Sequence, residues 1–211
     1  MHHNGTTRRF FIAAAILPLI APSVFADVLQ GSNPARHGRR SREVWLKAMS
    51  LAEARVGRAD GDLQAVFFVD LNCPACVQLW QWFDRPDHKD WNTLWVPVAH
   101  MHATSASKAI ALLRATDTHE ALSQNFGEAF DRHGRSGGLA PVSDPIPAEL
   151  SSIRANTHFW RTSLYEATPI SLYRKRDGTY WQILGQLPQP QMSRALMELA
   201  PASLPMFKEP R

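Results

Sequence analysis

The two cysteines of this sequence, Cys73 and Cys76, stand in the run Cys-Pro-Ala-Cys. Two thiols at this spacing can form a disulfide with each other and exchange it with other thiols, and the same spacing also occurs in zinc sites. A disulfide that only staples a turn is a further possibility, but such a short loop offers little entropic stabilisation. The secondary structure predicted on either side of the cysteines is therefore needed to distinguish between these roles.

A buried strand is predicted before the pair and an amphipathic helix after it. The run Ala65–Val69 is apolar, β-branched and aromatic, which is typical of a buried strand. After the cysteines, Val77, Trp80 and Phe83 recur on one helical face. Pro74 suits the first helical position, where its missing N–H costs nothing.

This arrangement places Cys73 at a helix N-terminus. Free N–H groups and the helix dipole stabilise an anion there, so the pKa of Cys73 is expected to fall below that of a free thiol. Cys76 lies one turn further in, shielded by the helix and positioned to attack a disulfide on Cys73. The pattern predicts a redox-active dithiol.

The segment before the first strand is predicted to hold two pieces. Residues 27–40 are polar and rich in Gly, Pro and Arg, and we interpret them as a flexible arm. Ser41–Arg55 has a helical pattern in a segment spanning residues 41–60, with Ser41 as its cap. Because a lone helix of this length is marginal, it is expected to pack on its own domain through Trp45 and Leu51.

The rest of the chain adds further strands and helices. A strand is predicted over Trp91–Ala99, and Pro97 indicates its end. Three helices follow, and then a strand entered through a proline, a hairpin turn, a partner strand and a closing helix. The helices are Ser105–Arg114, with Ser105 as its cap, Thr118–Arg132 and, after the loop 133–147, residues 148–165. The strand entered through the proline covers residues 167–173, the hairpin turn 176–178, the partner strand 179–184 and the closing helix 188–199.

The order of these elements is that of an α/β protein with a thioredoxin fold. A helical insertion separates the half that carries the cysteines from the half that carries Pro169. The catalytic domain is predicted over residues 61–200, and residues 201–211 are a C-terminal tail.

At this level the sequence resembles the periplasmic disulfide isomerases of the DsbC/DsbG type, and DsbG more closely. The resemblance spans about residues 60–200 and rests on the segments Phe67–Cys76, Ser107–Leu113, Ala167–Ile170 and the Asp177-Gly178-Thr179 hairpin. It implies that Cys73 attacks, that Cys76 resolves, and that a cis-proline faces the pair, with Pro74 and Ala75 tuning their reactivity. The cis-proline falls on Pro169, and Thr168 precedes it as part of the substrate-binding site.

The residues themselves support this role for Pro169. A proline at the start of a sheet strand cannot donate to the ladder. A cis bond from Thr168 to Pro169 would turn the backbone of Thr168 toward the cysteines, free to pair with a bound peptide. An ordinary trans proline at a strand start is the alternative.

Two departures from the resembling family bear on function. Those isomerases carry an N-terminal dimerisation domain, whereas few residues precede Gln64 here, so we expect a monomer or weak homodimer that acts mainly as a reductase. The second departure is Ala75, where larger residues are usual and whose small side chain leaves Cys73 more open. In addition, the position six residues before Cys73 holds Phe67 and no acid, so proton transfer from Cys76 is expected to rely on water.

The N-terminus is predicted to be an export signal, residues 1–26, removed after Ala26. Arg8-Arg9 followed by Phe10-Phe11-Ile12 resembles the twin-arginine signal, although Ala13 replaces the usual lysine, and an ordinary Sec signal is the alternative. Either route delivers the protein to the periplasm, an oxidising compartment.

The leading hypothesis is a thiol:disulfide oxidoreductase that acts on exported proteins as a reductase, an isomerase or a sulfenic-acid reductase. Its expected partners are thiol- or disulfide-containing exported proteins and a DsbD-like membrane thiol reductant. A net charge of +4 without a basic, aromatic-rich cluster argues against nucleic-acid binding. No cofactor or metal is expected.

Two alternatives stay open. The first is metal handling, in which His100 and His102 would join the cysteines in a Cys₂His₂ site, although a solvated loop is the simpler interpretation of the two histidines. The second is an adaptor role in a secretion or conjugation apparatus, where small thioredoxin-like proteins resembling this one occur.

Overall fold

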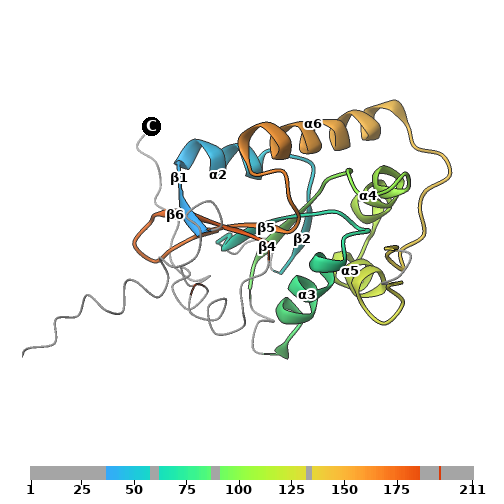
Figure 1. The fold of residues 1–211 in the computed structure, drawn as a ribbon, viewed down its shortest axis with the longest axis horizontal. Coiled ribbons are helices and arrows are strands. Elements are labelled where there is room, and N and C mark those ends of the chain that lie inside the picture. Colours follow the sequence, from blue (N-terminus) through green and yellow to red (C-terminus); the bar gives the residue numbers. More distant parts are fainter. Residues whose placement is uncertain (1–36, 58–61, 87–90, 132–134, 186–194, 196–211) are drawn as a thin grey trace, which may run out of the picture. The chain divides into compact units, whose positions relative to one another are not determined.

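A computed structural model describes residues 37–57, 62–86, 91–131, 135–185 and 195. The predicted export signal and most of the predicted closing helix lie outside these residues. The described residues form one six-stranded sheet in the order β1-β6-β5-β3-β4-β2, with helices on both faces (Figure 1). The strands are β1 His37–Arg40, β2 Ala54–Val56, β3 Ala65–Val69, β4 Thr93–Pro97, β5 Ile170–Arg174 and β6 Tyr180–Leu184.

The centre of the sheet has mixed strand directions. β3 runs parallel to β4, with Phe67 opposite Trp95, and antiparallel to β5, with Phe67 opposite Ser171. β5 and β6 form an antiparallel hairpin, and β1 and β2 add antiparallel edges. Together with the helix between β3 and β4, this topology confirms the predicted thioredoxin fold.

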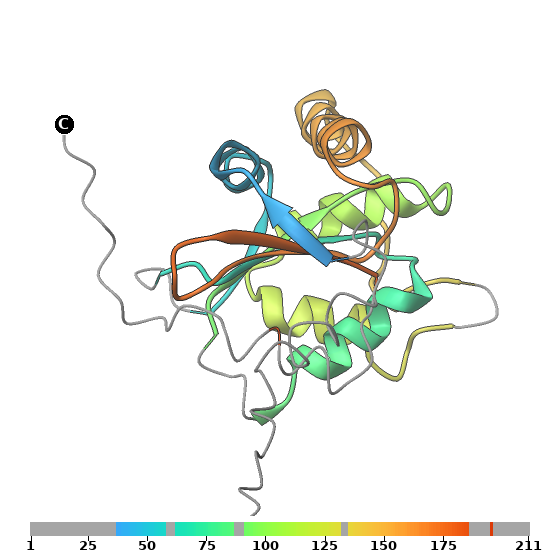
Figure 2. The same cartoon turned by 60° about the vertical axis from the view of Figure 1, so that its left-hand side comes forward.

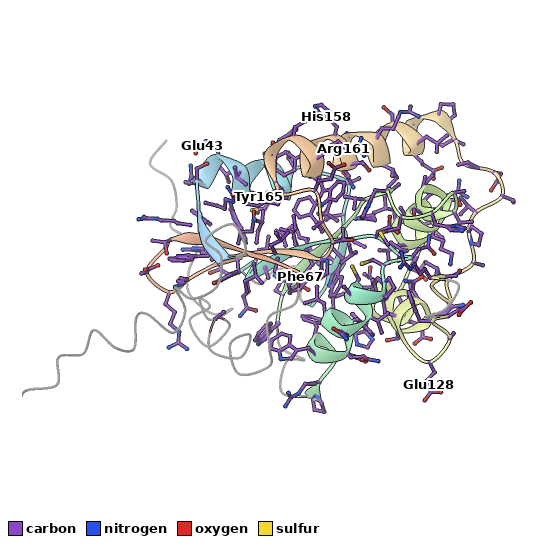
Figure 3. All side chains as sticks on the ribbon, in the orientation of Figure 1. Glu43, Phe67, Glu128, His158, Arg161 and Tyr165 are labelled. Atoms are coloured by element: carbon purple, nitrogen blue, oxygen red, sulfur yellow. The ribbon has the colours of Figure 1, made fainter. Side chains whose placement is uncertain are left out.

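Each face of the sheet is covered by its own pair of helices. Figure 2 shows α2 and α6 on one side of the sheet and α3 and α5 on the other. Side chains of β3 alternate between them: Phe67 packs with α3 and α5 residues, and Phe68 packs with α2 and α6 residues. Figure 3 places Phe67 in this interior. The helices are α2 Arg42–Met49, α3 Pro74–Phe83, α4 Ser105–Arg114, α5 Thr118–Phe126 and α6 Pro147–Ser163.

The core beside the cysteines is rich in aromatic side chains. The rings of Trp80 and Trp95 lie 5.3 Å apart, edge to face, and Phe83 lies 5.4 Å from Trp95. Trp80 and Trp95 are almost wholly buried. Large aromatic side chains bury much apolar area each, so this cluster fixes α3, and with it the cysteines, against the sheet.

The predicted N-terminal helix is shorter than expected. Ser41 caps it as predicted, accepting from the Val44 N–H, but the helix ends at Met49. The Asn156 side chain of α6 both accepts from the Ala52 N–H and donates to the Ala52 carbonyl, which holds this stretch outside the helix. The predicted helix through Arg55 is therefore wrong, because Ala54–Val56 forms β2 against β4.

Two other predictions concern this region of the chain. Trp45 and Leu51 are buried in the core with Phe68, so the predicted packing of the helix on its own domain is confirmed. The prediction of a flexible arm over residues 27–40 is wrong at its end, because His37–Arg40 pairs with Tyr180–Ile183 as edge strand β1.

The helical insertion is present between β4 and β5, with changed boundaries. α5 ends at Phe126 rather than Arg132, because Gly127, the C-cap residue, has a ψ of −147° and leaves the helical conformation. α4 begins at Ser105, but Thr104 is its N-cap, so the prediction that Ser105 caps is wrong. α6 covers Pro147–Ser163, close to the predicted range.

The second half of the fold follows the prediction. β5 and β6 are joined by a turn in which Gly178 has a φ of +80°, a conformation that favours glycine. Asp177 stabilises that turn by accepting from the N–H and hydroxyl of Thr179. Within the described residues, no helix combines the length and apolar character needed to cross a membrane.

Candidate active site

The two cysteines lie at the start of α3, as predicted. Cys73 is the N-cap residue, in an extended conformation, and Pro74 takes the first helical position. Both cysteines are free thiols and both are buried: Cys73 is 4% exposed and Cys76 is 0% exposed. The Cys76 N–H bonds the Cys73 carbonyl at 3.0 Å, which closes the turn between them.

The two thiols have opposite acidities. The pKa of Cys73 is lowered to about 6, chiefly by a hydrogen bond from the Cys76 side chain. Burial of Cys73 opposes this shift, while the Thr168 side chain and the backbone N–H groups of Ala75 and Cys76 add to it. Burial, followed by the neighbouring Cys73, raises the pKa of Cys76 well above that of a free thiol. The pair is therefore one thiolate and one thiol at neutral pH.

The loop before β5 supplies the other wall of the site. The Thr168–Pro169 peptide bond is cis, as expected from the sequence, and Pro169 is buried. In its protonated form, Cys73 donates from Sγ to the Thr168 carbonyl at 3.4 Å. The structure thus brings together four residues singled out in the sequence, Cys73, Cys76, Thr168 and Pro169, with Pro74 and Ala75 in the turn between the cysteines.

A buried acid, which the sequence analysis overlooked, lies below this turn. The position occupied by Phe67 is apolar, as expected, but Asp70 is 0% exposed and stands three residues before Cys73. Its Oδ1 accepts from the Asn72 N–H at 2.9 Å and from the Ser105 hydroxyl at 2.8 Å. The Ser105 oxygen itself accepts from the Asn72 side chain and the His102 N–H, so it is not available to cap α4. An aspartate directly after a buried strand was the signal that could have revealed it.

Asp70 also holds the loop that follows β4. Its Oδ2 accepts from the backbone N–H of His100 at 2.8 Å and from that of Met101 at 2.9 Å. Asp70 therefore accepts four hydrogen bonds from three segments of the chain. A buried carboxylate with this many donors is well satisfied, and it fixes the Cys73 turn against two neighbouring loops.

The helical insertion supports the same turn from a second side. Asn72 donates to the Ser105 hydroxyl at 3.0 Å and accepts from the Gly137 N–H at 3.3 Å. Lys108, nearly buried, donates to the Gly137 carbonyl and to the Ser136 hydroxyl. These contacts link the residue just before Cys73 to α4 and to the loop after α5. None of them was predicted, because their partners are far apart in the sequence.

The two histidines after β4 do not join the cysteines. The His100 Nε2 lies 3.0 Å from the Thr168 hydroxyl, and the His102 Nδ1 lies 3.0 Å from the Thr104 hydroxyl. In the part of the chain that the structure describes, no group of three or more His, Cys, Asp or Glu side chains could hold a metal ion. The proposed Cys₂His₂ site is therefore not formed there.

Comparison with known proteins supports the fold. No protein-family model matches the sequence, and no curated protein matches it. Among solved structures, ScsC of Proteus mirabilis in a compact conformation is similar, with a TM-score of 0.52 and 14% identity over 83% of this chain and 87% of that one. The thiol-disulfide exchange protein α-DsbA2 of Wolbachia pipientis has a TM-score of 0.51 and 13% identity over 74% of this chain and 91% of that one.

These structures share the architecture at low sequence identity. They confirm for this chain a mixed α/β sheet of the thioredoxin type with a helical insertion. At this level of identity they show the fold alone.

Proposed function

We propose that this protein is a thiol:disulfide oxidoreductase in which Cys73 attacks and Cys76 resolves. The observation that carries the proposal is the separation of the two thiols' acidities, with a pKa of about 6 for Cys73 and one well above the ordinary value for Cys76. Only a thiolate is a nucleophile in disulfide exchange. One thiol of the pair is thus ready to attack at neutral pH while the other keeps its proton.

The first step joins the protein to its client. The Cys73 thiolate attacks one sulfur of a client disulfide, a new S–S bond forms to Cys73, and the second client sulfur leaves as a thiolate. A client segment alongside Thr168 would lie next to the attacking sulfur, since the Thr168 carbonyl is 3.4 Å from the Cys73 Sγ.

The second step releases the client. Once Cys73 is bonded to the client it carries no charge, so its contribution to the raised pKa of Cys76 disappears. Cys76 then loses its proton to water or to the departing client thiolate and attacks the Cys73 sulfur. The protein disulfide forms, and the first client sulfur leaves as a thiolate, which takes a proton from water. Two electrons pass from the dithiol to the client, and an external thiol reductant must return them.

The finer assignment rests on the sequence. The export signal predicted over residues 1–26 would place the protein in the periplasm, and a DsbD-like membrane reductant would regenerate the dithiol. The resemblance to the DsbC/DsbG type supports clients among exported proteins. Solved structures of similar fold include one whose name describes thiol-disulfide exchange. We propose reduction of a narrow set of clients as the main activity, with isomerisation weaker.

Reduction of insulin by dithiothreitol, followed with and without the protein, tests this function. The wild-type protein is expected to accelerate the reaction, and Cys73→Ser is expected to abolish the acceleration. Cys76→Ser is expected to stop turnover after the mixed disulfide. Acceleration that survives Cys73→Ser would show that the dithiol is not the reacting group.

A further inference from the structure

His100 connects the two halves of the site. Its backbone N–H donates to Asp70 Oδ2 at 2.8 Å, and Asp70 accepts from the Cys73 N–H through its own carbonyl at 3.0 Å. Its ring Nε2 lies 3.0 Å from the Thr168 hydroxyl. One residue therefore touches both the turn that carries Cys73 and the loop that carries the cis-proline.

The imidazole is held in a fixed orientation. It stacks on Trp160 with ring centroids 4.5 Å apart and an angle of 30° between the planes. Trp160 is 0% exposed, and its indole N–H donates to the Ala167 carbonyl at 2.8 Å, directly before Thr168. Because the same indole positions both the imidazole and the loop, the contact between His100 and Thr168 is set by the fold.

Thr168 in turn contacts the attacking sulfur. Its carbonyl lies 3.4 Å from the Cys73 Sγ and accepts from it while Cys73 is protonated. A hydrogen bond from the Thr168 side chain is one of the causes that lower the pKa of Cys73, because it stabilises the thiolate. A threonine hydroxyl has one proton to donate. If His100 Nε2 accepts that proton, the hydroxyl cannot donate to Cys73. If Nε2 carries a hydrogen and donates it, the hydroxyl proton is free to turn toward the thiolate.

We propose that His100 is a positioning residue that donates from Nε2–H to Thr168 Oγ1 and thereby directs the Thr168 hydroxyl proton to the Cys73 thiolate. The inference rests on the proposed role of Cys73 as the attacking sulfur. Each proton stays on its own heavy atom, so the device transfers no proton and needs no further reactant. It holds the nucleophile in its charged form until a client disulfide arrives.

The charges around His100 are consistent with a neutral donor. Burial is the largest influence and lowers the pKa of His100, with Arg161 acting in the same direction. Asp70 and Glu166 act in the opposite direction. The ring is therefore neutral at neutral pH, where one tautomer supplies Nε2–H. Acidification protonates the other nitrogen and leaves the Nε2–H donor in place, so the contact persists.

Titration of the Cys73 thiolate by its ultraviolet absorbance tests the proposal in two variants of similar size. His100→Leu keeps an apolar side chain against Trp160 and removes the donor, whereas His100→Gln keeps an N–H donor near the position of Nε2. We expect the Leu variant to raise the pKa of Cys73 by about one unit, a roughly tenfold loss of thiolate in acid. The Gln variant is expected to stay close to wild type.

A matched control and a mutant cycle separate this effect from general damage. His158, exposed on the outer side of α6 (Figure 3), provides His158→Ala, which is expected to leave the titration unchanged. In a Thr168→Val background, which lacks the hydroxyl, His100→Leu is expected to have no added effect on Cys73. Equal shifts in the Leu and Gln variants, no shift in either, or additive shifts in the cycle would overturn the proposal.

The titration requires no client. Failure of the contact between His100 and Thr168 is therefore seen apart from any failure of the exchange function, which insulin reduction reports separately.

Discussion

Cys76 is expected to control the reactivity of Cys73 before it ever acts as a resolving thiol. Its side chain makes the largest contribution to the lowered pKa of Cys73, because its S–H donates to the thiolate. Cys76→Ala removes this donor, so the pKa of Cys73 should rise. Cys76→Ser keeps a hydroxyl donor at the same position and should retain part of the effect.

The size of the effect on rate can be bounded. At about pH 6, a Cys73 pKa of about 6 gives roughly half thiolate, and a full return to the ordinary value of 9.0 would leave about 0.1%. The more basic thiolate is also more nucleophilic, by ~20-fold for three units at a Brønsted coefficient of about 0.45. The net loss of rate at this pH is therefore at most about 25-fold, rather than the ~500-fold that the thiolate populations alone would give.

Alkylation by iodoacetamide as a function of pH measures this effect. The wild-type rate at Cys73 is expected to reach half its plateau near pH 6, the pKa of this thiol. The midpoint should move to higher pH in Cys76→Ser and further in Cys76→Ala. Cys73→Ala is the control, because the remaining Cys76 is fully buried and should react slowly. A wild-type midpoint near 9, or an unchanged midpoint in Cys76→Ala, would refute the reasoning.

Three further predictions address the rest of the chain. Gly137→Ala should destabilise the fold by about 1–3 kcal/mol in chemical denaturation, because a Cβ there would meet the Asn125 side chain and the Leu71 carbonyl, and wild-type stability would contradict this. The exported protein should begin at Asp27 by mass spectrometry, and export that survives replacement of Arg8-Arg9 by two lysines would indicate the Sec route. Sedimentation at micromolar concentration should give a monomer or weak dimer, and a tight dimer that unscrambles disulfides efficiently would contradict the preference for reduction.

The parts of the fold predicted correctly are those with a strong local signal. The run Ala65–Val69 is apolar at every position and is buried at every position. Pro74 set the start of α3 because few other positions in a helix tolerate proline. The cis bond at Thr168–Pro169 was implied by the family resemblance of the sequence, and a proline at a strand entrance agreed with it.

The errors arise where distant partners decide the structure. His37–Arg40 is polar and has no strand pattern of its own, and it is a strand because β6 offers a free edge. Ala54–Val56 continues a helical pattern, but the side chain of Asn156 bonds Ala52 and Ala54–Val56 pairs with β4, so the helix ends before this segment. Local propensity cannot report such contacts, because tertiary context overrides it.

The residues of the site also differ in how far they could be predicted. The reacting cysteines could be predicted from the Cys-Pro-Ala-Cys run, because both lie within four consecutive residues. The residues that support them could not, since Asp70 acts through His100 and Ser105, which lie about 30 residues further along the chain. His100 itself was considered only as a metal ligand or as part of a solvated loop, and its contact with Thr168 is between residues 68 positions apart.

The mixed disulfide is the most direct test of the central claim. Reduced Cys76→Ser protein would be mixed with a peptide that contains one disulfide, quenched with acid, and mapped by mass spectrometry after proteolysis. The mechanism predicts a peptide adduct on Cys73 in this variant, no adduct in Cys73→Ser, and a Cys73–Cys76 disulfide with free peptide thiols in the wild type. An adduct that forms in Cys73→Ser, or no adduct in Cys76→Ser, would contradict the assignment of Cys73 as the attacking thiolate.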